Sequence, residues 1–206
     1  MLSNRRIHVA VYDTLADWEP GHLLAELRTG RFTGRPHEVV TVGPALDPIT
    51  TMGGLRVVPD LALSELSPRD SELLVLPGAA LWDAGGGEEF ADAARAFLAA
   101  GVPVAAICGA TVGLARAGLL DDRPHTSAAL AYLQGAPGYR GAEQYRDERA
   151  VAADGLITAG PDSPVQFAAA TLVELGLIDD ELRAAYEGVF SSADASRFPE
   201  LMAARA

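Results

Sequence analysis

Short apolar runs alternate with stretches of helical spacing along most of the chain. Runs that are short and rich in β-branched residues predict strands, and apolar positions three and four residues apart predict helices. Strands are predicted at 7–13, 37–43, 71–79 and 102–107, with hairpins at 50–60 and 150–160. Helices are predicted at 17–29, 88–101, 109–118, 162–176 and about 180–190. This alternation predicts an α/β fold: a doubly wound, mostly parallel sheet with helices on both faces.

Length and composition favour one domain that spans residues 1–206. The chain has 206 residues, of which 49% are hydrophobic, so a substantial core is possible without disulfides. There is no internal repeat and no domain linker, although residues 134–150 form a polar loop and the tail after Ser191 is expected to pack loosely or to mediate contacts. No secretory signal and no run of about 18 apolar residues are present. A cytoplasmic protein that does not span a membrane is therefore expected.

Charge and residue usage exclude several classes of function. The formal net charge is −12, so nucleic acid and anionic membrane surfaces are poor partners. The 16 basic residues are all arginine, which excludes a lysine Schiff base, a pyridoxal phosphate anchor and a Walker A loop. A single cysteine excludes an intrachain disulfide and a cysteine metal cluster, and His8, His22 and His37 lack metal-ligand spacing. No metal and no cofactor are predicted.

The only cysteine, Cys108, falls where strand 102–107 turns directly into helix 109–118. Ligands of open parallel sheets bind beyond the carboxyl ends of the strands, which is where this junction lies. The small residues Ala106, Gly109 and Ala110 fit the tight strand-to-helix turn known for serine nucleophiles as G-x-S-x-G. The alternative is that Cys108 is a small buried hydrophobic residue, as many free cysteines are.

A reactive Cys108 would have two advantages at this junction. The positive end of a helix favours a thiolate, and the Gly109 N–H would point to the place where an oxyanion forms. A second amide could come from Gly78 or Ala79, at the end of the neighbouring strand. Trp18 and Trp82 also fall beside the predicted site, where they would line its mouth or cover apolar surface at an oligomer contact.

Four segments in the same order resemble the ThiJ/PfpI superfamily, whose fold is flavodoxin-like and related to class I glutamine amidotransferases. They are "LADWEP", "LLVLPGA", "AAICGATVGLARAGLL" and "LITAGPDSPVQFA". The resemblance implies that Cys108 is the reactive cysteine of a nucleophile elbow, and that Glu19 is a protonated acid in contact with its sulfur. It also implies a homodimer. Without the resemblance, Glu19 would be a first-turn residue that favours the helix dipole.

The sequence departs from the superfamily at its histidines. The protease-like members have a histidine directly after the cysteine, where this chain has Gly109. The deglycase has one downstream, where this chain has Ala128. His125 lies three positions earlier, which would place it on the opposite face of a regular strand. It is either a catalytic base that reaches the site from a strand end, or a structural residue there or at a dimer contact.

These features predict a cysteine-dependent enzyme that acts on small carbonyl or amide compounds. Glyoxalase or deglycase-like chemistry ranks ahead of amidase or other hydrolase chemistry, because amide hydrolysis needs a base for the leaving amine. The alternative is a non-enzymatic redox or stress-responsive protein in which Cys108 is oxidised reversibly. A third possibility is an amidotransferase-like fold without a catalytic role.

Overall fold

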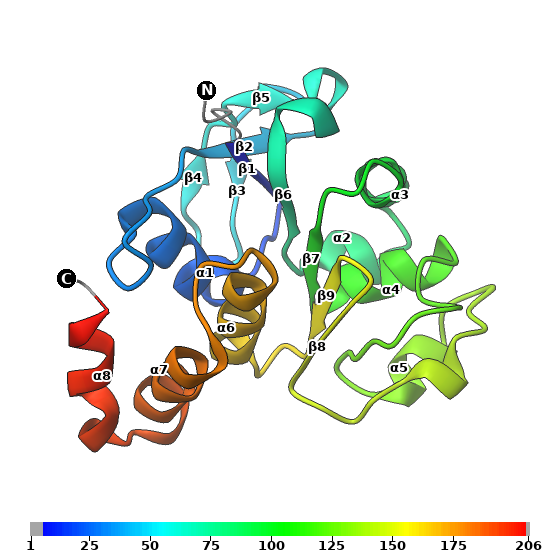
Figure 1. Ribbon diagram of the computed structural model, residues 1–206. Helices are drawn as coiled ribbons and strands as arrows, with labels where there is room; N and C mark the ends of the chain where they lie inside the picture. The colour runs from blue at the N-terminus through cyan, green and yellow to red at the C-terminus, as the bar shows by residue number, and fades with distance from the viewer. Residues whose placement is uncertain (1–5, 205–206) are drawn as a thin grey trace.

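The computed structural model describes residues 6–204, and its main feature is a seven-stranded sheet (Figure 1). The strand order is β5-β2-β1-β6-β7-β9-β8. The strands are β1 (Arg6–Ala10), β2 (Val39–Gly43), β5 (Leu61–Ala62), β6 (Ser71–Leu76), β7 (Val104–Ile107), β8 (Ala150–Ala153) and β9 (Leu156–Ala159). Every neighbouring pair is parallel except β8 and β9. The predicted doubly wound, mostly parallel sheet is therefore confirmed.

Helices cover both faces of this sheet (Figure 1). One layer comprises α1 (Trp18–Thr29), α6 (Pro164–Glu174), α7 (Asp180–Ser192) and α8 (Phe198–Ala203). The other comprises α2 (Ala80–Asp83), α3 (Glu88–Ala99), α4 (Gly109–Arg116) and α5 (Leu130–Gln134). In β6, Leu73 and Val75 pack with the first layer, whereas Leu74 and Leu76 pack with the second. Both strand faces are buried, which explains the nearly continuous apolar runs in the sequence.

Smaller elements complete the chain. The expected hairpins are present: β3 (Ile49–Thr50) pairs with β4 (Arg56–Val57) as a separate two-stranded sheet, and β8 pairs with β9. Four 3₁₀ helices span Leu63–Glu65, Pro68–Asp70, Ala142–Gln144 and Ala195–Arg197. Within the described chain, no helix combines the length and the apolar character needed to cross a bilayer.

The tail after Ser191 was expected either to pack loosely or to mediate contacts, and the structure contradicts the first of these. Instead of packing loosely after Ser191, the chain forms α8, and the Leu201 side chain is fully buried. Leu201 belongs to the same apolar cluster as α1 and α6. The six-residue helix was not predicted because it is too short for a helical period to show.

Trp82 corrects a second expectation. It neither lines the mouth of a site nor covers an exposed surface, because its side chain is fully buried. The indole nitrogen donates to the Pro77 carbonyl at 3.1 Å and to the Tyr12 hydroxyl at 3.0 Å. A Cβ atom at Gly113 would lie 2.2 Å from the indole ring, and one at Gly87 would lie 2.4 Å from it. These glycines make room for a large core side chain directly beneath α4.

This packing predicts opposite effects for two glycine-to-alanine changes. Gly113→Ala should lower the free energy of unfolding by about 1–3 kcal/mol, because the new methyl group clashes with a tryptophan that cannot move aside. The matched control is Gly21→Ala on α1, where the position is exposed and no atom lies within 4 Å. This control should raise the free energy of unfolding by up to about 1 kcal/mol. Urea denaturation measures both, and equal stability of the two variants would contradict the packing described for Trp82.

Candidate active site around Cys108

Cys108 occupies the turn between β7 and α4, at the carboxyl edge of the sheet. Its backbone has φ 58° and ψ −126°, an unfavourable conformation for a residue with a side chain. Two groups hold it there. The Cys108 N–H donates to the Ala159 carbonyl at 3.0 Å, and the Cys108 carbonyl accepts from the Thr111 hydroxyl at 2.6 Å. The predicted strand-to-helix turn is present, and it leaves the side chain half-buried rather than sealed in the core.

Glu19 reaches this cysteine from the first turn of α1, and it is fully buried. The start of α1 is fixed against the end of β6, because the Ala16 N–H donates to the Gly78 carbonyl at 2.9 Å. The Gly78 N–H in turn donates to Glu19 Oε2 at 2.6 Å, while Oε1 is buried without a hydrogen-bond partner. A Cβ at Gly78 would lie 2.9 Å from Cys108 Cβ and 2.8 Å from Glu19 Oε2. Glycine at 78 therefore lets the carboxyl and the cysteine approach each other.

Burial governs the protonation of both acids. It raises the pKa of Glu19 to about 7, although the Gly78 N–H and the Cys108 side chain act in the opposite direction. It also raises the pKa of the Cys108 thiol to about 12, and the Glu19 carboxylate adds to this effect. The Gly109 N–H lowers the pKa of the thiol, but it does not outweigh burial. The start of α4 therefore favours the thiolate as expected, but burial opposes this effect more strongly.

The thiol and the carboxyl must instead share their protons. A thiolate beside a neutral Glu19 carries the same total charge as a thiol beside a carboxylate. Moving one proton from Cys108 to Glu19 thus creates the nucleophile without burying a second negative charge. The Gly109 N–H, which faces the sulfur, favours this form.

The expected pair of oxyanion donors needs a correction at Gly78. Its N–H is already bound to the Glu19 carboxyl, so it is not free to hold an oxyanion. The neighbouring Ala79 N–H was the alternative, and no hydrogen bond is recorded for it within residues 6–204. Ala79 also lies against Gly109: its carbonyl oxygen is 3.3 Å from where a Gly109 Cβ would be. The Gly109 and Ala79 amides are the two candidates beside the sulfur.

His125 is fully buried, and both of its ring nitrogens have partners. Nδ1 lies 2.8 Å from the Arg123 carbonyl, to which it donates, and Nε2 lies 2.8 Å from the Tyr139 hydroxyl. Burial lowers the pKa of His125. In the described chain His125 does not lie on a regular strand, and a single bridge joins it to Tyr145. Among the described residues, no contact between this ring and Cys108 is recorded, so the geometry fits the structural alternative.

The remaining predicted residue, Trp18, lies at the rim of the site next to Glu19. Half of its surface is exposed, and its indole nitrogen donates to the Pro161 carbonyl at 3.2 Å. This bond connects the start of α1 with the loop before α6. The exposed face of Trp18 is consistent with the expected place beside the site.

Sequence reasoning missed two residues near Cys108. The Tyr132 hydroxyl on α5 donates to Asp83 Oδ1 at the end of α2, at 2.5 Å. Both side chains interact electrostatically with Cys108. Neither helix is long enough to show a period, so the pattern gave no warning. One signal was available. The deglycase carries a histidine at the position of Ala128, and Tyr132 lies four residues further along the chain.

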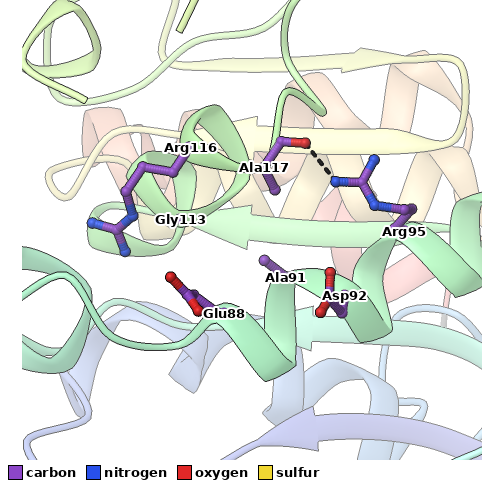
Figure 2. A pocket seen from close by; sticks show the side chains of 7 residues that line it. All are labelled: Glu88, Ala91, Asp92, Arg95, Gly113, Arg116 and Ala117. Atoms are coloured by element: carbon purple, nitrogen blue, oxygen red, sulfur yellow. Dashed lines mark hydrogen bonds between the residues drawn. The ribbon is translucent and has the colours of Figure 1, made fainter. Parts of the chain in front are cut away.

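A small pocket between α3 and α4 lies apart from these residues (Figure 2). Figure 2 shows Glu88, Asp92 and Arg95 from α3 facing α4, with Arg95 donating to the Ala117 carbonyl. The cavity of about 220 Å³ is smaller than most ligand pockets, and neither Cys108 nor Glu19 lines it. Within residues 6–204, no three histidine, cysteine, aspartate or glutamate side chains are grouped to hold a metal ion.

Comparisons with known proteins agree with this fold. The model of the DJ-1/PfpI family matches residues 5–174. The chain is 37% identical over 191 residues to "Uncharacterized protease YoaZ" of Bacillus subtilis, covering 90% of this chain and 91% of that protein. A solved thiJ/pfpI family protein from Bacillus anthracis is 36% identical, with a TM-score of 0.91 and coverage of 97% and 96%. The DJ-1 superfamily protein Atu0886 from Agrobacterium tumefaciens is 37% identical, with a TM-score of 0.83 and coverage of 92% and 98%.

The buried Glu19 carboxyl predicts a specific dependence of stability on pH. Its pKa rises from 4.5 in the unfolded chain to about 7 in the folded one. The folded chain therefore holds an extra proton in this window, and the resulting stability is lost as the pH rises through 7. Relative to Glu19→Gln, the native protein should lose about 3 kcal/mol of unfolding free energy between the two ends of the window.

Urea denaturation below pH 4.5 and above pH 7 measures this difference. All other carboxyls are common to the two proteins, so their titration cancels in the comparison. A difference between native protein and variant that stays constant across the window would show that the Glu19 pKa is not raised.

Proposed function

The chain belongs to the DJ-1/PfpI family, and on that premise we propose that it is a cysteine-dependent enzyme of small carbonyl compounds. The substrates would be 2-oxoaldehydes such as methylglyoxal. One observation carries the proposal: the half-buried Cys108 is held in a strained turn with the Gly109 N–H at its sulfur and the Glu19 carboxyl buried beside it. This arrangement supplies a nucleophile, a proton store and an oxyanion donor within one site.

The first step uses the shared proton. Glu19 takes the proton from Cys108, and the sulfur adds to the aldehyde carbon. The electron pair of the C=O bond moves to the oxygen, which is held by the Gly109 and Ala79 amides and then receives the proton from Glu19. The product is a hemithioacetal on Cys108.

The second step rearranges this adduct. The Glu19 carboxylate removes the hydrogen on the former aldehyde carbon, and the electron pair of that bond shifts to the neighbouring ketone oxygen to give an enediolate. Glu19 returns the proton to the neighbouring carbon while the hydroxyl proton on the former aldehyde carbon passes to the enediolate oxygen. The product is a thioester of a 2-hydroxy acid, which water then hydrolyses. The overall reaction converts a 2-oxoaldehyde and water into a 2-hydroxy acid and needs no external oxidant.

Peptide or amide hydrolysis is less well supported, although the curated relatives are called proteases. A leaving amine needs a proton donor close to the scissile bond. The two family positions for a histidine hold Gly109 and Ala128 here, and His125 is already bound at both nitrogens. An aldehyde has no leaving amine, so Glu19 is the only acid–base group that the addition to Cys108 and the rearrangement of the adduct require.

One observation favours a second function. The sulfur is partly accessible and faces the Gly109 N–H, so an oxidised sulfur would find a hydrogen-bond donor already in place. In that case the protein would respond to peroxide through reversible oxidation of Cys108, without turnover of a carbonyl substrate.

The distinguishing experiment compares methylglyoxal turnover by the native protein and Cys108→Ser. Turnover should fall at least about a thousandfold, because the nucleophile is lost. A matched control places a thiol elsewhere by adding Ser64→Cys, an exposed position, to the Cys108→Ser protein. This control should remain inactive, since a thiol outside the site lacks Glu19. Equal turnover by native protein and Cys108→Ser, together with selective peroxide oxidation of Cys108, would replace the enzyme by the redox function.

A homodimer is part of the same proposal. Exposed apolar side chains gather on and beside the β3–β4 hairpin, where Met52, Leu55 and Val58 each have more than half of their surface exposed. Apolar surface of this kind is typical of a site of association. Light scattering of the purified protein should give the mass of two chains, and a mass of one chain over the whole concentration range would contradict it.

A further inference from the structure

The Asp83–Tyr132 pair, which has no role so far, joins two helices that pack against the helix beginning after Cys108, and both side chains interact electrostatically with this cysteine. Asp83 ends α2 and Tyr132 lies within α5, and both helices pack against α4, the helix that begins after the cysteine. The Tyr132 hydroxyl donates to Asp83 Oδ1 at 2.5 Å. Asp83 is exposed and Tyr132 is half-buried, so water reaches the pair. Glu19, by contrast, is fully buried.

The position of Asp83 is fixed from behind by Arg116. This arginine on α4 donates to the carbonyls of Trp82 and Gly86, both at 2.8 Å, which are the residues on either side of the Asp83 turn. Figure 2 shows the Arg116 side chain reaching away from α4. Arg116 thus binds the backbone and leaves the Asp83 carboxylate to Tyr132. Within residues 6–204, Asp83 forms no ion pair.

The direction of the hydrogen bond decides what the pair offers. Because the Tyr132 proton points to Asp83, the lone pairs of its oxygen remain free to accept a hydrogen bond. Burial and the Asp83 carboxylate raise the pKa of Tyr132, so the hydroxyl stays neutral. The hydroxyl oxygen can therefore accept a hydrogen bond from a donor such as water or an alcohol.

We propose that Tyr132, oriented by Asp83, accepts a proton from the water that hydrolyses the Cys108 thioester. This inference rests on the proposed function, whose last step needs such a base, and the family's histidine positions do not supply one. The water oxygen bonds to the thioester carbon while its proton moves to Tyr132 Oη. The Tyr132 proton passes to Asp83 Oδ1, the carbon–sulfur bond breaks, and its electron pair returns to sulfur. Asp83 later releases the proton to solvent.

The experiment separates acylation from hydrolysis with 4-nitrophenyl acetate. Native protein should release a burst of nitrophenolate as Cys108 is acetylated, followed by slow turnover as water removes the acetyl group. Tyr132→Phe should keep the burst, while turnover falls by about ten- to a hundredfold. Mass spectrometry should show acetylated Cys108 accumulating in the variant. Asp83→Asn should behave in the same way, because the amide accepts a hydrogen bond from Tyr132 but not its proton.

Two further measurements exclude a merely structural effect. Hydroxylamine, a stronger nucleophile that needs no base, should remove the acetyl group from native protein and Tyr132→Phe at equal rates. The matched control is Tyr145→Phe, since no hydrogen bond is recorded for that hydroxyl within the described chain. Turnover by this variant should equal that of the native protein.

The outcomes distinguish this inference from the function on which it rests. A native protein that is never acetylated at Cys108 overturns the thiol-enzyme function and the role of Tyr132 with it. Acetylation followed by equal hydrolysis in native protein and Tyr132→Phe overturns only the role of Tyr132. If Tyr132→Phe also loses its burst, Asp83→Asn decides: normal hydrolysis in that variant overturns the inference.

Discussion

The close approach of a buried carboxyl to a sulfur is the constraint on which the site depends. Glu19 and Cys108 are both acids with raised pKa values, and burial is the main cause for each. Two negative charges cannot be held together in such a place, so one proton must remain between them. Gly78 maintains the arrangement in two ways, since its missing side chain gives the space and its N–H binds the carboxyl. The strained backbone at Cys108 then fixes the sulfur against this pair.

The sheet makes this arrangement possible because it brings separate segments to one edge. The ends of β6 and β7 are neighbours, and the start of α1 is bound to the end of β6 through Ala16 and Gly78. Beneath the edge, Trp82 fills the space that a glycine on α4 and another just before α3 leave open. The strain at Cys108 is therefore stored against a rigid and well-packed support, as expected where a turn has a chemical role.

Much of this could be predicted from the sequence, for reasons that also explain the failures. The central strands are short apolar runs and the long helices have a clear hydrophobic period, so the sheet and the Cys108 turn could be predicted from the sequence. Glu19 came from the resemblance of "LADWEP" to a known family and not from any pattern. The effect of the helix terminus on the pKa of Cys108 could be predicted from the sequence, whereas the larger and opposite effect of burial could not. The prediction for Trp82 was wrong because a tryptophan near a site can face the core or the solvent. Here Gly87 and Gly113 leave the space that its ring occupies in the core.

The same limit explains why the second acid–base group escaped notice. Asp83 and Tyr132 lie on helices of four and five residues, far apart in the sequence, and they meet only because α2 and α5 both pack on α4. Their meeting changes how the missing histidines should be interpreted. A histidine beside a nucleophile can both accept and donate a proton, because its charge changes near neutral pH. In our proposal these two roles are divided: a buried carboxyl of raised pKa holds the proton of the thiol, and a tyrosine tied to an exposed carboxylate accepts a proton from water. Neither group alone replaces a histidine, but together they supply a proton store and a proton acceptor for one thiol.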